Sequence, residues 1–279
     1  MIDLPLWQVD AFADRVFAGN PAAVVVAPDP LDSNLMQAIA AENNLAETAF
    51  LVPGAAKGRY GLRWFTPVAE VDLCGHATLA SGHVVLSGLD KGLDEGPNEG
   101  PKEGLDRAVF DTASGVLTVT REGEGYALDL PAQVMQPVAS PGGLAAAIGA
   151  TVLECHAGPK LVAVLESAGA VADLAPDLGY IAALDFDGLI VTAAGPGGEG
   201  GDFVSRYFAP HVGIDEDPVT GSAHCQLMPF WAGRLGRQSL TALQVSKRGG
   251  RLDCRLDGDR VVLAGKVAPY LAGRLRLPG

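Results

Sequence analysis

The hydrophobic and polar positions along the chain predict many short strands and one buried helix in each half. Residues 6–12 alternate between apolar and polar side chains, as a half-buried strand does, and residues 22–26 form a continuous apolar run. Residues 75 to about 87 are apolar on nearly every helical face, which predicts a helix inside a domain. Further strands are expected at 47–52, 60–66, 107–121, 125–131, 160–166, 187–193, 203–208 and within 239–267, and further helices at about 34–43, 143–149 and 221–235.

One strand–loop–helix phrase occurs twice. Residues 63–67 read RWFTP and residues 206–210 read RYFAP, and each phrase is followed by an acidic stretch and a Gly-x-Ala at the start of a predicted helix. The first Gly-x-Ala begins at Gly75, and the second begins at Gly221 after a three-residue insertion. A duplicated unit of this kind predicts two similar half-structures, with two helix N-termini that can face one another across a shared cleft.

The repeat predicts two pseudo-symmetric domains, residues 1–132 and residues 133–279. The fold class is α+β, because each half has many short strands and one buried helix. We expect a barrel-like, mostly antiparallel sheet around the helix at about 75–87 and another around the helix at about 221–235. The last segment is expected to pack back on the first half. The regular strand–helix alternation of a Rossmann fold or a TIM barrel is missing.

Residues 88–106 differ from the rest of the chain. Gly, Asp, Glu, Lys and Pro recur there without an apolar period, which predicts a solvated, mobile loop to which we assign no chemistry.

Composition excludes several classes of function. The chain has 279 residues, and 48% hydrophobic against 19% charged residues are ample for buried cores. A net charge of −13 argues against a nucleic-acid surface. The four cysteines are scattered, which fits reduced cytosolic thiols better than a disulfide framework. No apolar run is long enough to span a membrane and the first residues do not resemble a signal peptide, so we expect a cytoplasmic protein.

The two predicted helix starts are candidate anion sites. Small residues at Gly75 and Gly221 expose backbone N–H groups, and the helix dipole adds about half a positive charge at each start. Two such ends that meet would bind a carboxylate. In the structural alternative, the glycines only allow tight turns and Ser222 or Asp217 caps the second helix.

Candidate acids and bases lie beside these starts. Glu47 begins an apolar strand, where burial would raise the pKa of its carboxyl toward the range of a general acid–base; a strand-end side chain that points to water is the alternative. His76 follows Gly75 and could relay a proton, or it could simply pack. Cys74 precedes the first glycine and Thr220 precedes the second, so both are further candidates. Among the histidines, only His83 lies on the same predicted helix face as His76, and no carboxylate has a matching spacing. We therefore expect no metal site.

The chain resembles the PhzF-like family, which is related to the phenazine-biosynthesis isomerase and shares the diaminopimelate epimerase fold. The resemblance covers nearly the whole chain and is carried by four segments: QVDAFADRVFAGNPAAVV (8–25), AENNLAETAFL (41–51), RWFTPVAEVDLCGHATLASG (63–82) and DPVTGSAHC (217–225). It implies two barrel-like domains around central helices, with an active site in the cleft between them. It also implies an isomerase that needs no cofactor, usually a homodimer.

Site residues follow from the resemblance by motif position. Glu47 is similar to the family's general acid–base, and His76 and Asp217 are similar to groups that assist proton transfer. The substrate-binding set that the resemblance implies is Asn20, Gly75, Gly221 and Ser222. Diaminopimelate epimerase uses one cysteine before each helix, whereas Cys74 here corresponds to Thr220, so its pair of thiols is absent.

The sequence thus predicts a biosynthetic-type isomerase that moves a proton on a small carboxylate-bearing substrate. Two alternatives stay open. One is an amino-acid racemase or epimerase that uses Cys74 as one base. The other, from a different class, is a binding or scaffold protein that has kept the fold without activity.

Overall fold

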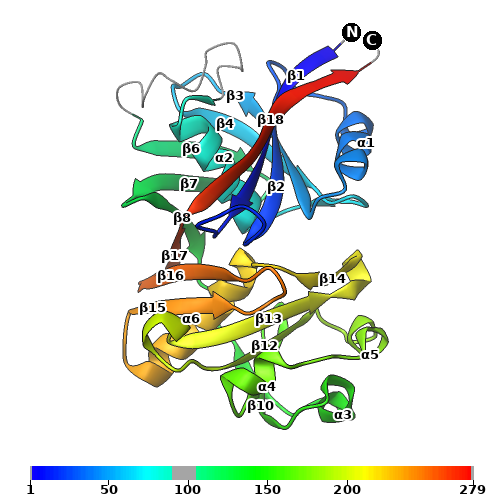
Figure 1. Ribbon diagram of the computed structural model, residues 1–279, viewed down its shortest axis with the longest axis vertical. Coiled ribbons are helices and arrows are strands. Elements are labelled where there is room, and N and C mark those ends of the chain that lie inside the picture. The colour runs from blue at the N-terminus through cyan, green and yellow to red at the C-terminus, as the bar shows by residue number, and fades with distance from the viewer. Residues whose placement is uncertain (1, 90–104, 278–279) are drawn as a thin grey trace. The chain divides into compact units, whose positions relative to one another are not determined.

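The computed structural model describes residues 2–89 and 105–277, and the chain divides into two compact units (Figure 1). Unit 1 contains the residues up to Asp129 together with those from Ala264 onward, and unit 2 runs from Leu130 to Leu263. The loop predicted at 88–106 lies outside the described residues except for its two ends.

Unit 1 is a mixed sheet that wraps around helix α2 (Gly75–Leu86) (Figure 1). Its strands are β1 (Ile2–Ala11), β2 (Asn20–Val26), β3 (Glu47–Pro53), β4 (Arg59–Phe65), β5 (Glu70–Val71), β6 (Arg107–Thr112), β7 (Gly115–Glu122), β8 (Gly125–Pro131) and β18 (Val267–Leu277). Pairing runs in the order β18–β1–β2–β3–β4–β6–β7–β8, with β5 on β4. The β2–β3 and β4–β6 pairs are parallel and the others are antiparallel.

The central helix is buried because strands surround it. Helix α2 contacts β1, β2 and β3 toward one end of the strand order, and β6 and β7 toward the other end. Every α2 residue except His83 is buried. A helix enclosed on all sides cannot keep a polar face, which explains why residues 75–86 are so uniformly apolar and small.

Helix α1 (Ser33–Asn43) covers the outer side of the unit 1 sheet (Figure 1). It contacts β3 and β4 and buries Met36, Ile39 and Ala40. Asp32 caps the helix, since its carboxylate accepts hydrogen bonds from the first backbone N–H groups.

Unit 2 repeats this design around helix α6 (Gly221–Leu235). Its strands are β9 (Gln136–Val138), β10 (Val152–Ala157), β11 (Leu161–Leu165), β12 (Leu189–Ala194), β13 (Phe203–Ala209), β14 (Ile214–Asp217), β15 (Ser239–Gln244), β16 (Gly250–Asp257) and β17 (Arg260–Gly265). Its other helices are α3 (Leu144–Ile148), α4 (Ala168–Ala172), α5 (Leu178–Ala182), η2 (Gly198–Gly200) and η3 (Pro210–Val212). Of the three five-residue helices, the sequence predicted α3 at about 143–149 but neither α4 nor α5.

Strand pairing shows that the repeat extends over both units. Unit 2 pairs in the order β9–β10–β11–β12–β13–β15–β16, with β14 on β13. Its parallel pairs are β11–β12 and β13–β15, which correspond to β2–β3 and β4–β6 of unit 1. Helix α6 connects β14 to β15 as α2 connects β5 to β6. The short phrase seen twice in the sequence is therefore the best-preserved part of a duplicated fold.

His224 on α6 is a neutral histidine in the core of unit 2, which makes folding sensitive to acid. Its side chain is fully buried, and Nδ1–H donates to the Thr220 carbonyl at 2.7 Å. Burial lowers the pKa of His224 to about 4, although the bond to Thr220 opposes this shift. Because the unfolded chain binds this proton near pH 6.5, the contribution is complete above that pH and is lost as the pH falls through 4.

We expect the free energy of unfolding to fall by about 2 kcal/mol between pH 7 and pH 4.5 through His224 alone. Urea unfolding at both values measures the loss. His224→Asn keeps an N–H donor for Thr220 and does not titrate, so its loss should be smaller by that amount. An equal loss in both proteins would place the acid sensitivity elsewhere.

Candidate active site

Four polar side chains meet at the start of α2 in unit 1. Asn20 is the first residue of β2 and Glu47 is the first residue of β3, and these strands are parallel, so both residues lie at the same sheet edge. His76 Nε2 lies 3.1 Å from Glu47 Oε2, and His76 Nδ1 lies 3.0 Å from Asn20 Nδ2. Cys74 Sγ lies 3.5 Å from the same Nδ1. Four predicted residues from three separate segments of the chain thus form one buried group.

Glu47 points into this group rather than to water. Its residue surface is 8% exposed and that of His76 is 3% exposed. The Oε2 atom is at ion-pair distance from His76, yet it accepts no well-aligned hydrogen bond from any described residue. A buried carboxylate oxygen whose nearest donor is poorly aligned is costly to maintain, so it marks a place where a ligand proton could be accepted.

His76 is oriented by its two neighbours. The Asn20 amide nitrogen can only donate, so in the neutral imidazole Nδ1 is the acceptor and the proton lies on Nε2, facing Glu47. Burial disfavours the imidazolium, but the negative charge beside it outweighs burial and raises the pKa of His76 well above its usual value. We attribute this shift to Glu47, because Cys74 is uncharged at neutral pH. A proton can therefore be held between His76 and Glu47.

Cys74 is a poor base at neutral pH. It is the N-cap of α2 but makes no side-chain cap hydrogen bond. Burial, together with the charge of Glu47, raises the pKa of its thiol to about 11. The helix dipole was expected to activate this thiol if the thiol was exposed, but Cys74 is only 5% exposed, so desolvation dominates.

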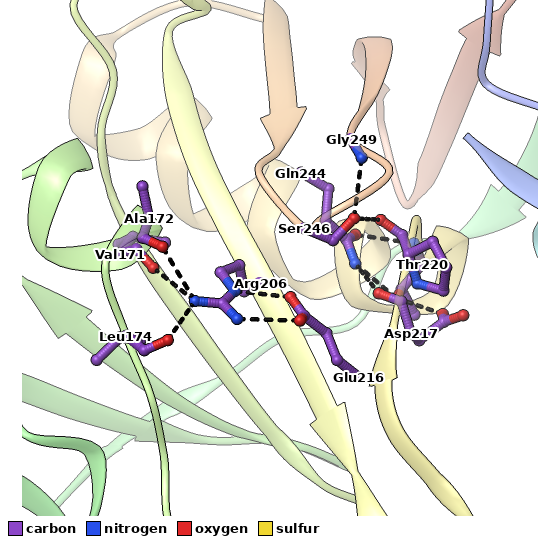
Figure 2. A network of polar contacts seen from close by, with 11 residues as sticks. Val171, Ala172, Leu174, Arg206, Glu216, Asp217, Thr220, Gln244, Ser246 and Gly249 are labelled. Atoms are coloured by element: carbon purple, nitrogen blue, oxygen red, sulfur yellow. Dashed lines mark hydrogen bonds and ion pairs between the residues drawn. The ribbon is translucent and has the colours of Figure 1, made fainter. Parts of the chain in front are cut away.

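The predicted residues of unit 2 form a second buried network at the start of α6 (Figure 2). Asp217 ends β14, and the Thr220 hydroxyl donates to its carboxylate. The Thr220 N–H donates to Gln244 Oε1 at 2.8 Å, and Gln244 Nε2 donates to the Asp217 carbonyl at 2.6 Å. Ser246 donates to the carbonyl of Pro218 at 2.8 Å. The sequence did not single out Gln244, because its role depends on a strand that follows the helix.

The helix starts in the two units have the same backbone form. Thr220 is the N-cap of α6 with φ −115° and ψ 102°, and Cys74 is the N-cap of α2 with φ −139° and ψ 108°. Neither Cys74 nor Thr220 makes a side-chain cap hydrogen bond. Gly221 is buried and Ser222 is half-buried in the first turn of α6.

The repeated arginine also has the same role in each unit. Arg63 forms a two-pronged ion pair with Glu70, and Arg206 forms one with Glu216 (Figure 2). These ion pairs tie the strand of the repeated phrase to the short strand that leads into the central helix. Arg206 additionally donates to carbonyl groups at the end of α4.

The strand registers identify which residues correspond between units. Trp64 of the first phrase pairs with Ala49, which pairs with Val24. Tyr207 of the second phrase pairs with Ile190, which pairs with Val162. Counting back two residues from Ala49 and from Ile190, Glu47 of unit 1 corresponds to Gly188 of unit 2. Counting back two residues from Val24 and from Val162, Ala22 of unit 1 corresponds to Lys160 of unit 2. Unit 2 thus has no carboxylate at the position of Glu47, so the acid–base group of unit 1 is not duplicated.

A metal ion could also fit the group in unit 1. Within the described part of the chain, Glu47, Cys74 and His76 each offer one ligand atom, and these atoms lie within 4.8 Å of one another. The sequence argument against a metal considered only histidines on one helix face and could not foresee this grouping. The expectation of a metal-free site stays a prediction.

Comparison with known proteins places the chain in a family. The model of the phenazine biosynthesis-like protein family (PhzC-PhzF) matches residues 9–273. The chain belongs to this family. It is 47% identical over 276 residues to an uncharacterized isomerase of Pseudomonas aeruginosa, covering 99% of this chain and 100% of that protein. It is 39% identical over 296 residues to the human phenazine biosynthesis-like domain-containing protein, covering 98% of this chain and 99% of that one.

A solved structure agrees with the fold described above. The crystal structure of a PhzF-family phenazine biosynthesis protein from Enterococcus faecalis has a TM-score of 0.88 and 42% identity, covering 99% of this chain and 100% of that chain. The predicted α+β class and the family resemblance are confirmed. Because family members are named isomerases, the protein is an isomerase and not an idle scaffold. Among the described residues, no helix is long and apolar enough to cross a membrane.

Proposed function

We propose that the protein moves a proton on a small carboxylate-bearing substrate without a cofactor, with Glu47 as the acid–base. The observation that supports this proposal is the buried Glu47 Oε2, which has no aligned hydrogen-bond donor among the described residues and lies 3.1 Å from His76 Nε2. A carboxylate held in this way can accept a proton from an activated C–H bond. His76, which lies beside Glu47, then stabilises the Glu47 carboxyl group while that group carries the proton.

The proposed reaction is a proton shift within one molecule. The Glu47 carboxylate takes a proton from carbon, which leaves the electron pair delocalised over the substrate's unsaturated system. The resulting carboxylic acid returns the proton to a different carbon, so that Glu47 is again ionised and the substrate is isomerised. A single base suits such a shift, whereas inversion at one carbon needs bases on both faces. Gly188 at the position corresponding to Glu47 supports the one-base scheme.

Solvent exchange tests the proposal. The purified chain, dialysed against EDTA, is incubated in D₂O with a panel of cyclic unsaturated carboxylic acids and amino acids, and carbon-bound protons are followed by ¹H NMR. We expect one substrate class to lose a proton signal and to gain deuterium at a second carbon. No exchange on any member of the panel would contradict proton transfer.

A racemase that uses Cys74 is the second candidate, because the Cys74 thiol lies 3.5 Å from His76 Nδ1. Since burial raises the pKa of this thiol to about 11, we expect Cys74→Ser to lower the exchange rate by less than about tenfold. The rate is measured on the best substrate of the panel. A loss as large as that caused by removing Glu47 would instead favour the racemase.

Several expectations from the sequence stay predictions. Binding of one carboxylate by both helix starts, a homodimeric state and a cytoplasmic location belong to this group. A role for Asp217, Ser222 and Thr220 in substrate binding belongs to it as well.

A further inference from the structure

Lys160 is a buried cation in unit 2. It immediately precedes β11 and is only 8% exposed. Its Nζ lies 5.5 Å from the centre of the Tyr207 ring, and no described residue forms a hydrogen bond or an ion pair with that ammonium. Burial lowers the pKa of Lys160, while Asp187 and Asp217 partly oppose this shift. A lysine side chain this buried, with no hydrogen bond or ion pair from a described residue, is rare in folded proteins.

The backbone of Lys160 is fixed on the central helix. Its N–H donates to Gln226 Oε1 at 3.1 Å, and its carbonyl accepts from Gln226 Nε2 at 3.1 Å. Gln226 is fully buried on α6. A side chain added at Gly158 would place its Cβ 2.7 Å from Gln226 Nε2, so this close approach depends on glycine. The backbone at Lys160 is therefore held in place against α6.

The duplicated fold places this lysine beside the position that corresponds to Glu47. Lys160 corresponds to Ala22, which pairs with Glu47 in unit 1. In unit 2 the position of Glu47 is occupied by Gly188, whose carbonyl accepts from the Leu161 N–H at 3.1 Å. A Cβ at Gly188 would lie 2.9 Å from the Tyr207 hydroxyl, so a larger residue does not fit there. The second unit thus carries a lysine beside the position that the acid occupies in the first unit.

We propose that Lys160 binds the carboxylate of a small ligand in unit 2. The ammonium supplies the charge, and the absence of an acceptor among the described residues leaves its donors for the ligand. A carboxylate group fits better than a phosphate group, because Asp217 and Asp187 act on the same ammonium and would repel a phosphate group, with up to two charges on one centre, more strongly than a carboxylate group with one. The choice of a carboxylate rests on the proposed function, which requires a substrate of that class.

Binding of succinate to the full chain tests this site. Amide resonances are followed by ¹H–¹⁵N NMR as succinate is added, with sodium chloride at matched ionic strength as the blank. We expect a saturable change at Leu161, Tyr207 and Thr220. Lys160→Met should weaken succinate binding at least about tenfold, since it removes the charge and keeps the length. Lys160→Arg should restore part of the binding, and Lys247→Met, which removes an exposed lysine in the same unit, should bind like the wild type.

The outcomes separate the two proposals. Equal succinate affinity in Lys160→Met and the wild type, with both folded by thermal unfolding, would overturn the carboxylate site. Tighter binding of inorganic phosphate than of succinate would overturn the choice of ligand class. Because no turnover is needed, this measurement stands even if Glu47 proves not to be the acid–base. Failure of the proposed function would appear only in the exchange assay.

Discussion

Glu47→Gln is expected to lower the rate of carbon–hydrogen exchange by about 10³-fold on the best substrate of the panel. The amide has the size of the carboxylate and can still contact His76, but it cannot accept a proton from carbon. It also removes the negative charge that raises the pKa of His76. Exchange in D₂O followed by ¹H NMR measures the rate directly.

A matched control separates the loss of a base from a general change of charge. Glu42 lies on α1 and is exposed, so Glu42→Gln makes the same chemical change away from the buried group. We expect Glu42→Gln to exchange at the wild-type rate. Thermal unfolding of both variants checks that each is folded. If a folded Glu47→Gln protein exchanged as fast as the wild type, Glu47 would have no part in proton transfer.

Gly82→Ala is expected to lower the free energy of unfolding by more than about 2 kcal/mol, although alanine is usually the better helix former. Gly82 lies on α2 where the helix packs against β7. A Cβ at this position would lie 2.3 Å from Val119 Cγ1 and 2.7 Å from Val119 Cβ. Because α2 is enclosed by the sheet, the helix cannot move away without disturbing other strands. Urea unfolding measures the change.

Two further variants isolate the steric cause. Gly233 lies in α6 with open space around it, so Gly233→Ala should stabilise the protein by up to about 1 kcal/mol. Val119→Ala in the Gly82→Ala background removes two clashing methyl groups and should recover part of the loss. A double-mutant cycle with no coupling between positions 82 and 119 would show that the clash is not the cause.

The central helices show how far the sequence alone could predict the fold. Helix α2 was expected at about 75–87 and ends at Leu86, and α6 was expected at about 221–235 and ends at Leu235. These predictions succeed because a helix enclosed by strands must be apolar all round, and such a segment is long enough to recognise. The short helices α4 and α5 were missed, and the segment predicted as one strand at 107–121 is the hairpin of β6 and β7.

The sequence identified the residues of the candidate site, but only the structure shows how they are arranged. Local motifs identified Asn20, Glu47, Cys74 and His76, because each belongs to a recognisable phrase. From the residues alone, however, Glu47 could equally have pointed to water. Its contact with His76 joins the first residue of a strand to the first turn of a helix that follows two strands later. That contact exists only when β2, β3 and α2 pack together.

By itself, the sequence determined the α+β class, the two central helices and the family, since these follow from the hydrophobic period and from contiguous motifs. The tertiary structure alone decided that Glu47 is buried beside His76, that Gly188 occupies the corresponding place in unit 2, and that Lys160 is a buried cation. Burial and electrostatic environment arise from residues distant along the chain. Local patterns carry no information about such neighbours until the strands are paired.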